Sequence, residues 1–300
     1  MSKVGLVQVD GKLPNLALMK IASYHQNKGD NVEWWVGPLF DYHRVYASKI
    51  FKFSDWPILP EGAIVGGTGI DWRNRLPEDI DRCLPWDSWW LYPRFNKHLG
   101  FSELGCRFKC SFCVVPQKEG RPRESSSIKD LLTNPMGEDR LILLDDDFFG
   151  QPNWEAKCKE IIALGLKVCF SQGLNIRVIT KKQAAYLVKI NFRNISFTGK
   201  QVTFAWDQYR DKKLIENGFK RCVEAGIKPY QMQFFVLIGY DTTEEQDLER
   251  VNILREWGCD PFVMAYDRDS QYQRDFQRWV NHRAIFKTVD FSEYARSRRK

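Results

Sequence analysis

Residues 202–266 read VTFAWDQYRDKKLIENGFKRCVEAGIKPYQMQFFVLIGYDTTEEQDLERVNILREWGCDPFVMAY. Three apolar runs, at 202–206, 231–238 and 261–266, have the length and composition of buried strands. The segments between them, 212–225 and 243–257, have the length and polarity of surface helices. Strands that alternate with helices in this way are typical of parallel sheets. This stretch therefore predicts an α/β fold.

The same alternation extends back along the chain to about residue 99. The predicted strands are 99–105, 141–144 and 167–171, and the predicted helices begin at 128, 154 and 181. Together with the three later strands this makes about six strand–helix units, fewer than the eight of a closed TIM barrel. We predict a partial (β/α)6 TIM-type barrel over residues 93–270. A C-terminal helix and basic tail are expected over 271–300.

The N-terminal part also alternates. Strands are predicted at 4–9, 32–36, 44–48 and 63–69, with a helix from Leu16 that Asn15 caps. We predict a small Rossmann-like doubly wound domain over residues 1–92, with a ligand crevice at its strand ends. The Pro- and Trp-rich segment 76–93 is interpreted as a linker.

Composition excludes few classes of function. The chain has 300 residues and a formal net charge of +7, an excess that permits a nucleic-acid partner without requiring one. The basic end, Arg296–Lys300, is either a solvated tail or a non-specific phosphate contact. Residues 1–10 do not form a signal peptide and no run is long enough to span a membrane. We therefore expect a cytoplasmic protein with no membrane partner.

The cysteines carry the most specific signal. Of the eight, Cys106, Cys110 and Cys113 form a C-x3-C-x2-C motif. Structural zinc sites usually have four ligands in paired arrangement, and His98 and Cys83 lie too far upstream to complete one. The remaining cysteines, Cys158, Cys169, Cys222 and Cys259, are scattered, so no second cluster is expected. Three thiolates leave one metal position open for a substrate or cofactor.

This motif, with the aromatic Phe112 before its last cysteine, resembles that of the radical SAM superfamily. The resemblance implies a [4Fe–4S] cluster on Cys106, Cys110 and Cys113, with S-adenosylmethionine (SAM) chelated to the open iron. It further implies reductive cleavage of SAM to methionine and a 5′-deoxyadenosyl radical, which abstracts hydrogen from an unknown substrate. An external one-electron reductant of the flavodoxin or ferredoxin type would then be a partner.

The resemblance also suggests SAM contacts at successive strand ends. Asp146 or Asp147 would hold the SAM amino group, and a solvated turn is the alternative. A polar turn after the next strand would hold the ribose and carboxylate, with a helix cap as the alternative. Asp207 would face substrate or sulfonium, and a fifth strand would contact adenine unless it is ordinary core. The residues of the turn and of the fifth strand are Gln172, Asn175, Arg177, Ile238 and Gly239.

The N-terminal segment resembles the cobalamin-binding-like domain found in one branch of that superfamily. The turn Val65–Thr68 fits, but no Asp-x-His-x-x-Gly motif is present, and His25 and His43 have other surroundings. Cobalamin is therefore not expected, unless it binds without a protein ligand, and the domain is a candidate for substrate recognition. Residues 10–21 resemble uncharacterised radical SAM proteins of bacteria and phages, which implies no particular activity.

Two alternatives remain open. One is a zinc- or cluster-stabilised binding protein, with nucleic acid as one candidate ligand and no turnover. The other keeps the cluster and assigns methyl or sulfur transfer. Colour separates the first from the radical hypothesis because zinc is colourless.

Overall fold

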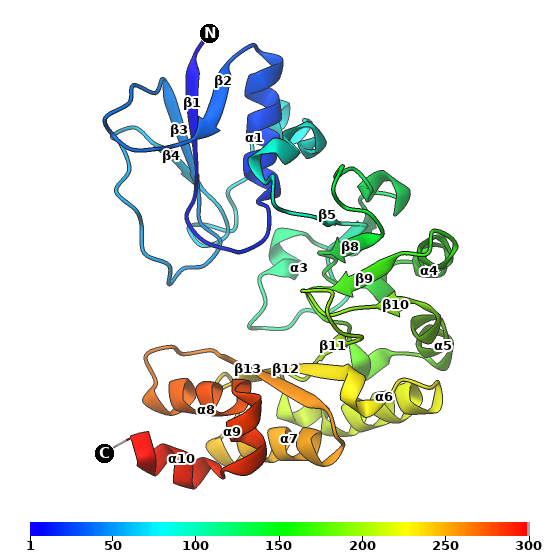
Figure 1. Ribbon diagram of the computed structural model, residues 1–300. Coiled ribbons are helices and arrows are strands. Elements are labelled where there is room, and N and C mark those ends of the chain that lie inside the picture. Colours follow the sequence, from blue (N-terminus) through cyan, green and yellow to red (C-terminus); the bar gives the residue numbers. More distant parts are fainter. Residues whose placement is uncertain (299–300) are drawn as a thin grey trace. The chain divides into compact units, whose positions relative to one another are not determined.

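The computed structural model describes residues 1–298, with side chains described through residue 295. The chain divides into two compact units (Figure 1). The first comprises Met1–Gly100 and Leu132–Glu138, and the second comprises Phe101–Leu131 and everything from Asp139 onward. Residues 132–138 belong to the first unit because the buried His98 ring accepts the amide of Asn134 and bonds the Glu138 carbonyl, at 3.1 and 3.0 Å.

A four-stranded parallel sheet forms the centre of the first unit. Its order is β2-β1-β3-β4, with bounds Asn31–Trp34, Lys3–Gln8, Arg44–Ser48 and Ile64–Gly66. Helix α1 (Leu16–Asn27) joins β1 to β2 and begins at Asn15, whose side chain accepts the amides of Ala17 and Leu18. Such caps satisfy amides that have no partner within the helix.

The doubly wound arrangement is found only in part. No helix lies in either of the later connections, 35–43 and 49–63, among the described residues. Pro57 and Pro60 oppose a helix in the second connection, because proline removes an amide donor. These loops expose many apolar side chains: Val36, Leu39, Phe40, Ile50, Phe51, Phe53, Trp56 and Ile58.

Segment 76–93 is not the linker that the sequence predicted. It forms α2 (Glu78–Asp81) and a 3-10 turn at Pro85–Leu91. The turn lies along α1, where the buried hydroxyls of Ser23 and Ser88 are 2.9 Å apart. Trp89 is 7% exposed. Burial of these tryptophan-rich residues makes the segment part of the folded unit.

Parallel strands and helices alternate in the second unit, which confirms the predicted α/β class. One set of strands is β8 (Arg140–Leu143), β9 (Lys167–Phe170) and β10 (Asn191–Phe192). The other is β11 (Val202–Ala205), β12 (Met232–Ile238) and β13 (Asp260–Ala265). A parallel bridge between Leu174 and Phe204 connects the chain after β9 to β11. Closure of these strands into a partial barrel stays a prediction.

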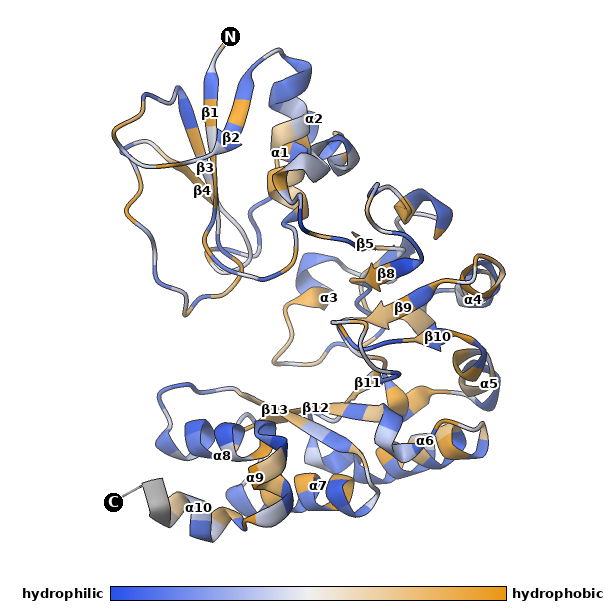
Figure 2. Cartoon of the chain, in the orientation of Figure 1, coloured by the Kyte–Doolittle hydropathy of each residue, from blue (hydrophilic) through white to orange (hydrophobic). Residues whose placement is uncertain are grey.

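The helices follow the strands that the sequence indicated. They are α4 (Trp154–Ala163), α5 (Lys181–Lys189), α6 (Lys212–Glu224) and α7 (Glu244–Glu256). The helix predicted from residue 128 is only a 3-10 turn, Lys129–Leu131. Alternate residues of β12, from Met232 to Ile238, are fully buried, and Figure 2 shows β8 and β9 as largely hydrophobic.

Three helices end the chain: α8 (Gln271–Asn281), α9 (Arg283–Thr288) and α10 (Phe291–Arg298). Phe276 and Trp279 of α8 are fully buried, in line with a helix docked through its aromatic face. The side chains of the predicted basic tail, Arg296–Lys300, lie outside the described ones. Within residues 1–298, no helix is long and apolar enough to cross a membrane.

Candidate functional site

The cysteine motif lies in a loop that a short antiparallel pair closes. Strand β6 (Glu103–Leu104) pairs with β7 (Arg123–Glu124), and the Cys106 amide donates to the Gly120 carbonyl at 3.1 Å. Gly105, at the neck, has φ +91°, and a Cβ there would lie 2.4 Å from the Arg121 carbonyl oxygen. Only glycine fits this conformation and this close approach.

All three motif cysteines are partly exposed, whereas Cys158, Cys169, Cys222 and Cys259 are buried. Burial raises the pKa of Cys106 to about 12 and also raises that of Cys113, and the neighbouring motif thiols add to both shifts. Within the described residues, no group of three or more His, Cys, Asp or Glu side chains is placed so that it could hold a metal ion. An iron–sulfur cluster places different demands on its ligands, because its thiolates bind different irons.

Three consecutive carboxylates after β8 hold this loop. Asp145 accepts the Ser102 amide at 2.7 Å and also the Ser102 hydroxyl. Asp146 accepts the Gly105 amide at 3.0 Å. Asp147 forms a two-point ion pair with Arg107, at 2.7 and 3.0 Å, and accepts the Arg107 amide. Charge-assisted bonds of this kind are the strong ones, so the carboxylates fasten the loop to the sheet.

These contacts bear on the roles predicted for Asp146 and Asp147. Both oxygens of Asp147 accept hydrogen bonds from the Arg107 guanidinium, so this carboxylate already has a structural role. Asp146 uses one oxygen on the Gly105 amide, and burial raises its pKa to about 6. Of the two, Asp146 therefore has the greater capacity left for a ligand.

Glu103 is the buried acid that sequence reasoning missed. Its side chain is fully buried, Oε1 accepts the Asp147 amide at 2.6 Å, and Oε2 has no partner among the described residues. Burial raises its pKa to about 8, and the three neighbouring aspartates contribute. With this pKa, the carboxyl is mostly protonated at neutral pH.

Replacing this acid with its amide, Glu103→Gln, should flatten the pH dependence of stability. The folded pKa of about 8 lies above the ordinary value of 4.5, so the folded chain keeps a proton that the unfolded chain loses. Stability therefore falls as pH rises across this window, by up to about 1.4 kcal/mol per pH unit. Between about pH 6 and pH 8, the free energy of unfolding of Glu103→Gln should fall by up to about 2 kcal/mol less than that of wild type.

Urea unfolding of the cluster-free chain at both pH values measures this difference. Glu224→Gln, at a surface position on α6 with a side chain 64% exposed, serves as the matched control and should behave as wild type. An equal loss in Glu103→Gln and wild type would show that Glu103 titrates normally.

Arg177 faces the cysteine loop from the turn after β9. Its guanidinium donates to Asp211 at 2.7 Å and to Asn175 at 3.1 Å, and it lies 4.7 Å from the centre of the Phe108 ring. Burial opposes its charge, but Asp211 and the nearby Cys110 raise the pKa of Arg177. Asn175 therefore orients the arginine, whereas Gln172 in the same turn is exposed.

An aromatic row connects the loop to the ends of β12 and β13. The Phe112 ring lies 5.4 Å from Tyr240, and Tyr240 lies 4.8 Å from Tyr266. Ile238 is fully buried in the core. Gly239 has φ +73°, and its missing Cβ makes room for Gln273 of α8. A glycine is therefore required here by the protein's own Gln273 side chain.

Asp207 follows β11 and is largely buried, which raises its pKa to about 6 although Arg250 and Arg177 oppose the shift. Arg250, fully buried, donates to the Trp206 and Leu237 carbonyls, each at 2.8 Å, and pairs with Asp247 at 2.6 Å. It thus fastens the ends of β11 and β12 together. No pattern in the sequence marked Arg250.

The structure brings several predicted residues to the cysteine loop. The charges of Asp146 and Asp207 raise the pKa of the Cys113 thiol, and the charge of Asp147 raises the pKa of Cys106. Arg177 lies near Cys110. Phe112 lies in the loop itself. Arg107, Phe108 and Tyr240 belong to the same cluster and were not predicted. The residues that these three contact are distant in sequence. Only Arg107 and Phe108 could have been proposed as site residues, because they lie within the cysteine motif.

No protein family model matches the chain. One stretch is similar to a curated protein. It is the ribosomal protein uS12 methylthiotransferase RimO of Opitutus terrae, 33% identical over 76 residues. The match covers 22% of this chain and only 16% of that protein. This partial similarity hints at a relation to radical SAM enzymes and leaves the function open.

Proposed function

We propose that this protein is a radical SAM enzyme. The observation that carries the proposal is the loop with Cys106, Cys110 and Cys113, partly exposed and closed at its neck by Gly105. Three thiols in eight residues, beside a tethered Arg177, form a donor set with one metal position left for a cofactor. The partial similarity to a methylthiotransferase is in keeping with this chemistry.

The residues present fit an iron–sulfur cluster. Thiolate ligands add negative charge, and the guanidinium groups of Arg107 and Arg177, each paired with an aspartate, lie at the loop. Burial raises the pKa of Cys106 and Cys113, so these thiols ionise readily only when a metal replaces the proton. The four other cysteines of the second unit are buried and lie outside the motif.

In the proposed mechanism Cys106, Cys110 and Cys113 would hold a [4Fe–4S] cluster. When bound, that cluster supplies one electron to SAM, whose cleavage gives methionine and a 5′-deoxyadenosyl radical. Asp146 would receive the SAM amino group, and Arg177, whose guanidinium Asn175 and Asp211 already orient, would bind its carboxylate. The Phe112–Tyr240–Tyr266 row would cover the loop on the side of β12 and β13. The protein's part is positioning and exclusion of solvent.

The other predicted contacts belong to the same proposal. Gln172 would reach the ribose, Asp207 the sulfonium or the substrate, and Ile238 and Gly239 the adenine. The strands of the second unit would form the partial barrel that carries these residues. The first unit would then recognise a substrate whose identity is open.

Electron paramagnetic resonance of anaerobically reconstituted, dithionite-reduced protein tests the proposal. A [4Fe–4S]⁺ signal that changes when SAM is added, together with release of 5′-deoxyadenosine, is expected. A colourless protein without a signal would favour a zinc-stabilised binding protein. A signal indifferent to SAM would favour a structural cluster.

Methylthio transfer is a second candidate, favoured by the similarity to RimO. Such a reaction would leave S-adenosylhomocysteine among the products if a methyl group is transferred. Sulfur insertion would normally require a second cluster, and the four remaining cysteines of the second unit are buried apart from the motif. Product analysis separates this candidate from hydrogen abstraction alone.

A further inference from the structure

A small basic cavity lies at the other end of the second unit's strands. It has a volume of about 170 Å³ and is formed around the start of β13, the end of α7 and helix α9. Asp260 begins β13, and Tyr230 lies in the turn before β12. The candidate site uses residues after the carboxyl ends of β11 and β12, so this cavity is separate from it.

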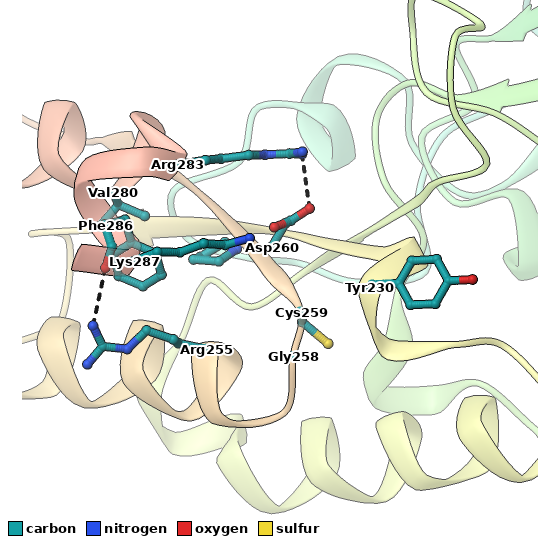
Figure 3. Close-up of a pocket in the computed structure, with 10 residues that line it drawn as sticks. Tyr230, Arg255, Gly258, Cys259, Asp260, Val280, Arg283, Phe286 and Lys287 are labelled. Carbon is teal, nitrogen blue, oxygen red and sulfur yellow. Dashed lines mark hydrogen bonds and ion pairs between the residues drawn. The ribbon is translucent and has the colours of Figure 1, made fainter.

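Three cationic side chains and one carboxylate line the cavity: Arg255, Arg283, Lys287 and Asp260. Figure 3 shows Lys287 extending from α9 across the cavity and Arg283 reaching Asp260. The Arg283–Asp260 ion pair is 3.0 Å long, which leaves an excess of two positive charges. Burial raises the pKa of Cys259 to about 12, so that thiol adds no negative charge.

The two arginines are held in place before any ligand arrives. Arg255 donates to the Phe286 carbonyl at 3.2 Å and lies over the Phe286 ring. Arg283 is held by Asp260. Lys287 is exposed and forms no hydrogen bond or ion pair with the described residues. Pre-oriented guanidinium groups and a free ammonium are the donors that a compact anion requires.

We propose that this cavity binds a phosphate group. The excess of two charges matches a dianion, and the volume is below the roughly 300 Å³ of sites for larger ligands. The Tyr230 side chain, 69% exposed, lies at the rim, with its hydroxyl pointing away from the cationic side chains (Figure 3). The phosphate belongs either to a small molecule or to a nucleic-acid backbone, and this site does not depend on the proposed radical chemistry.

Isothermal titration of the full chain with inorganic phosphate, at constant ionic strength, tests the proposal. Lys287→Gln should weaken phosphate binding about tenfold, and Lys287→Arg should largely restore it. Lys181→Gln is the matched control, because Lys181 on α5 is 84% exposed and its nearest carboxylate is 4.0 Å away. The control should bind phosphate as wild type does.

A second arm uses a single-stranded uridine decanucleotide without terminal phosphates. If the decanucleotide competes with phosphate for wild type but not for Lys287→Gln, the phosphate that binds here belongs to a nucleic-acid backbone. Phosphate binding without competition would assign it to a small phosphorylated molecule. No heat of phosphate binding, or equal binding in wild type and Lys287→Gln, would overturn the proposal.

Discussion

Alanine at Cys106, Cys110 or Cys113 is expected to remove the iron–sulfur cluster and, with it, the SAM-dependent EPR signal. Each thiolate is one of three protein ligands in the proposed site, and no other cysteine of the second unit lies partly exposed to replace it. Loss of even an outer contact typically costs roughly 10- to 100-fold in metal affinity. We therefore expect at least a roughly tenfold loss of retained iron for each substitution. Iron content and visible absorbance after anaerobic reconstitution measure it.

Cys83→Ala is the matched control for these variants. Cys83 is also partly exposed, lies in the first unit and has only a weak contact with the Asp79 carbonyl. This variant should retain iron and the spectrum of wild type. Full iron in all three motif variants would contradict the proposed ligand set. Colourless wild-type protein containing zinc would replace it with the zinc-stabilised alternative.

The largest loss of stability is expected from Arg250→Met. The Arg250–Asp247 pair has no exposed surface on either side chain, and the same guanidinium binds the Trp206 and Leu237 carbonyls. The substitution removes the partner of a buried carboxylate and of three backbone acceptors, the carbonyls of Trp206, Asp207 and Leu237. Breaking a buried pair in this way costs about 3–5 kcal/mol in the free energy of unfolding. Urea denaturation measures the cost.

Two further variants test whether the Arg250–Asp247 pair causes this loss of stability. Arg221→Met, on α6, removes an arginine that donates to one carbonyl, that of Ile179, and should cost about 1 kcal/mol. The double variant Asp247→Leu with Arg250→Met should recover part of the loss, because no buried charge remains unpaired. A cost for Arg250→Met no larger than that for Arg221→Met would show that the pair contributes little.

Much of the fold follows from local patterns. Strand β3 was predicted with the bounds that the structure has, and α1 begins at its predicted cap Asn15. Apolar runs and helix caps depend on neighbours within a few residues, so they can be recognised without the fold. Segment 76–93 was misjudged for the opposite reason. Its 3-10 turn packs against α1 and buries Trp89, and composition does not show what a residue will contact.

The candidate site divides in the same way. The C-x3-C-x2-C spacing is local, so the amino-acid sequence by itself determined which three cysteines form a candidate cluster site. It also placed Asp146, Asp147 and Arg177 at the carboxyl ends of strands, since parallel strands present those ends at one edge.

Tertiary structure alone decided what these residues contact. Asp147 pairs with Arg107, forty residues earlier, and Gly239 accommodates Gln273. The buried Glu103, the Arg250 tether and the cavity around Lys287 each combine residues from separate elements. Burial and pairing depend on distances between segments far apart in the chain, and those distances exist only once the chain has folded.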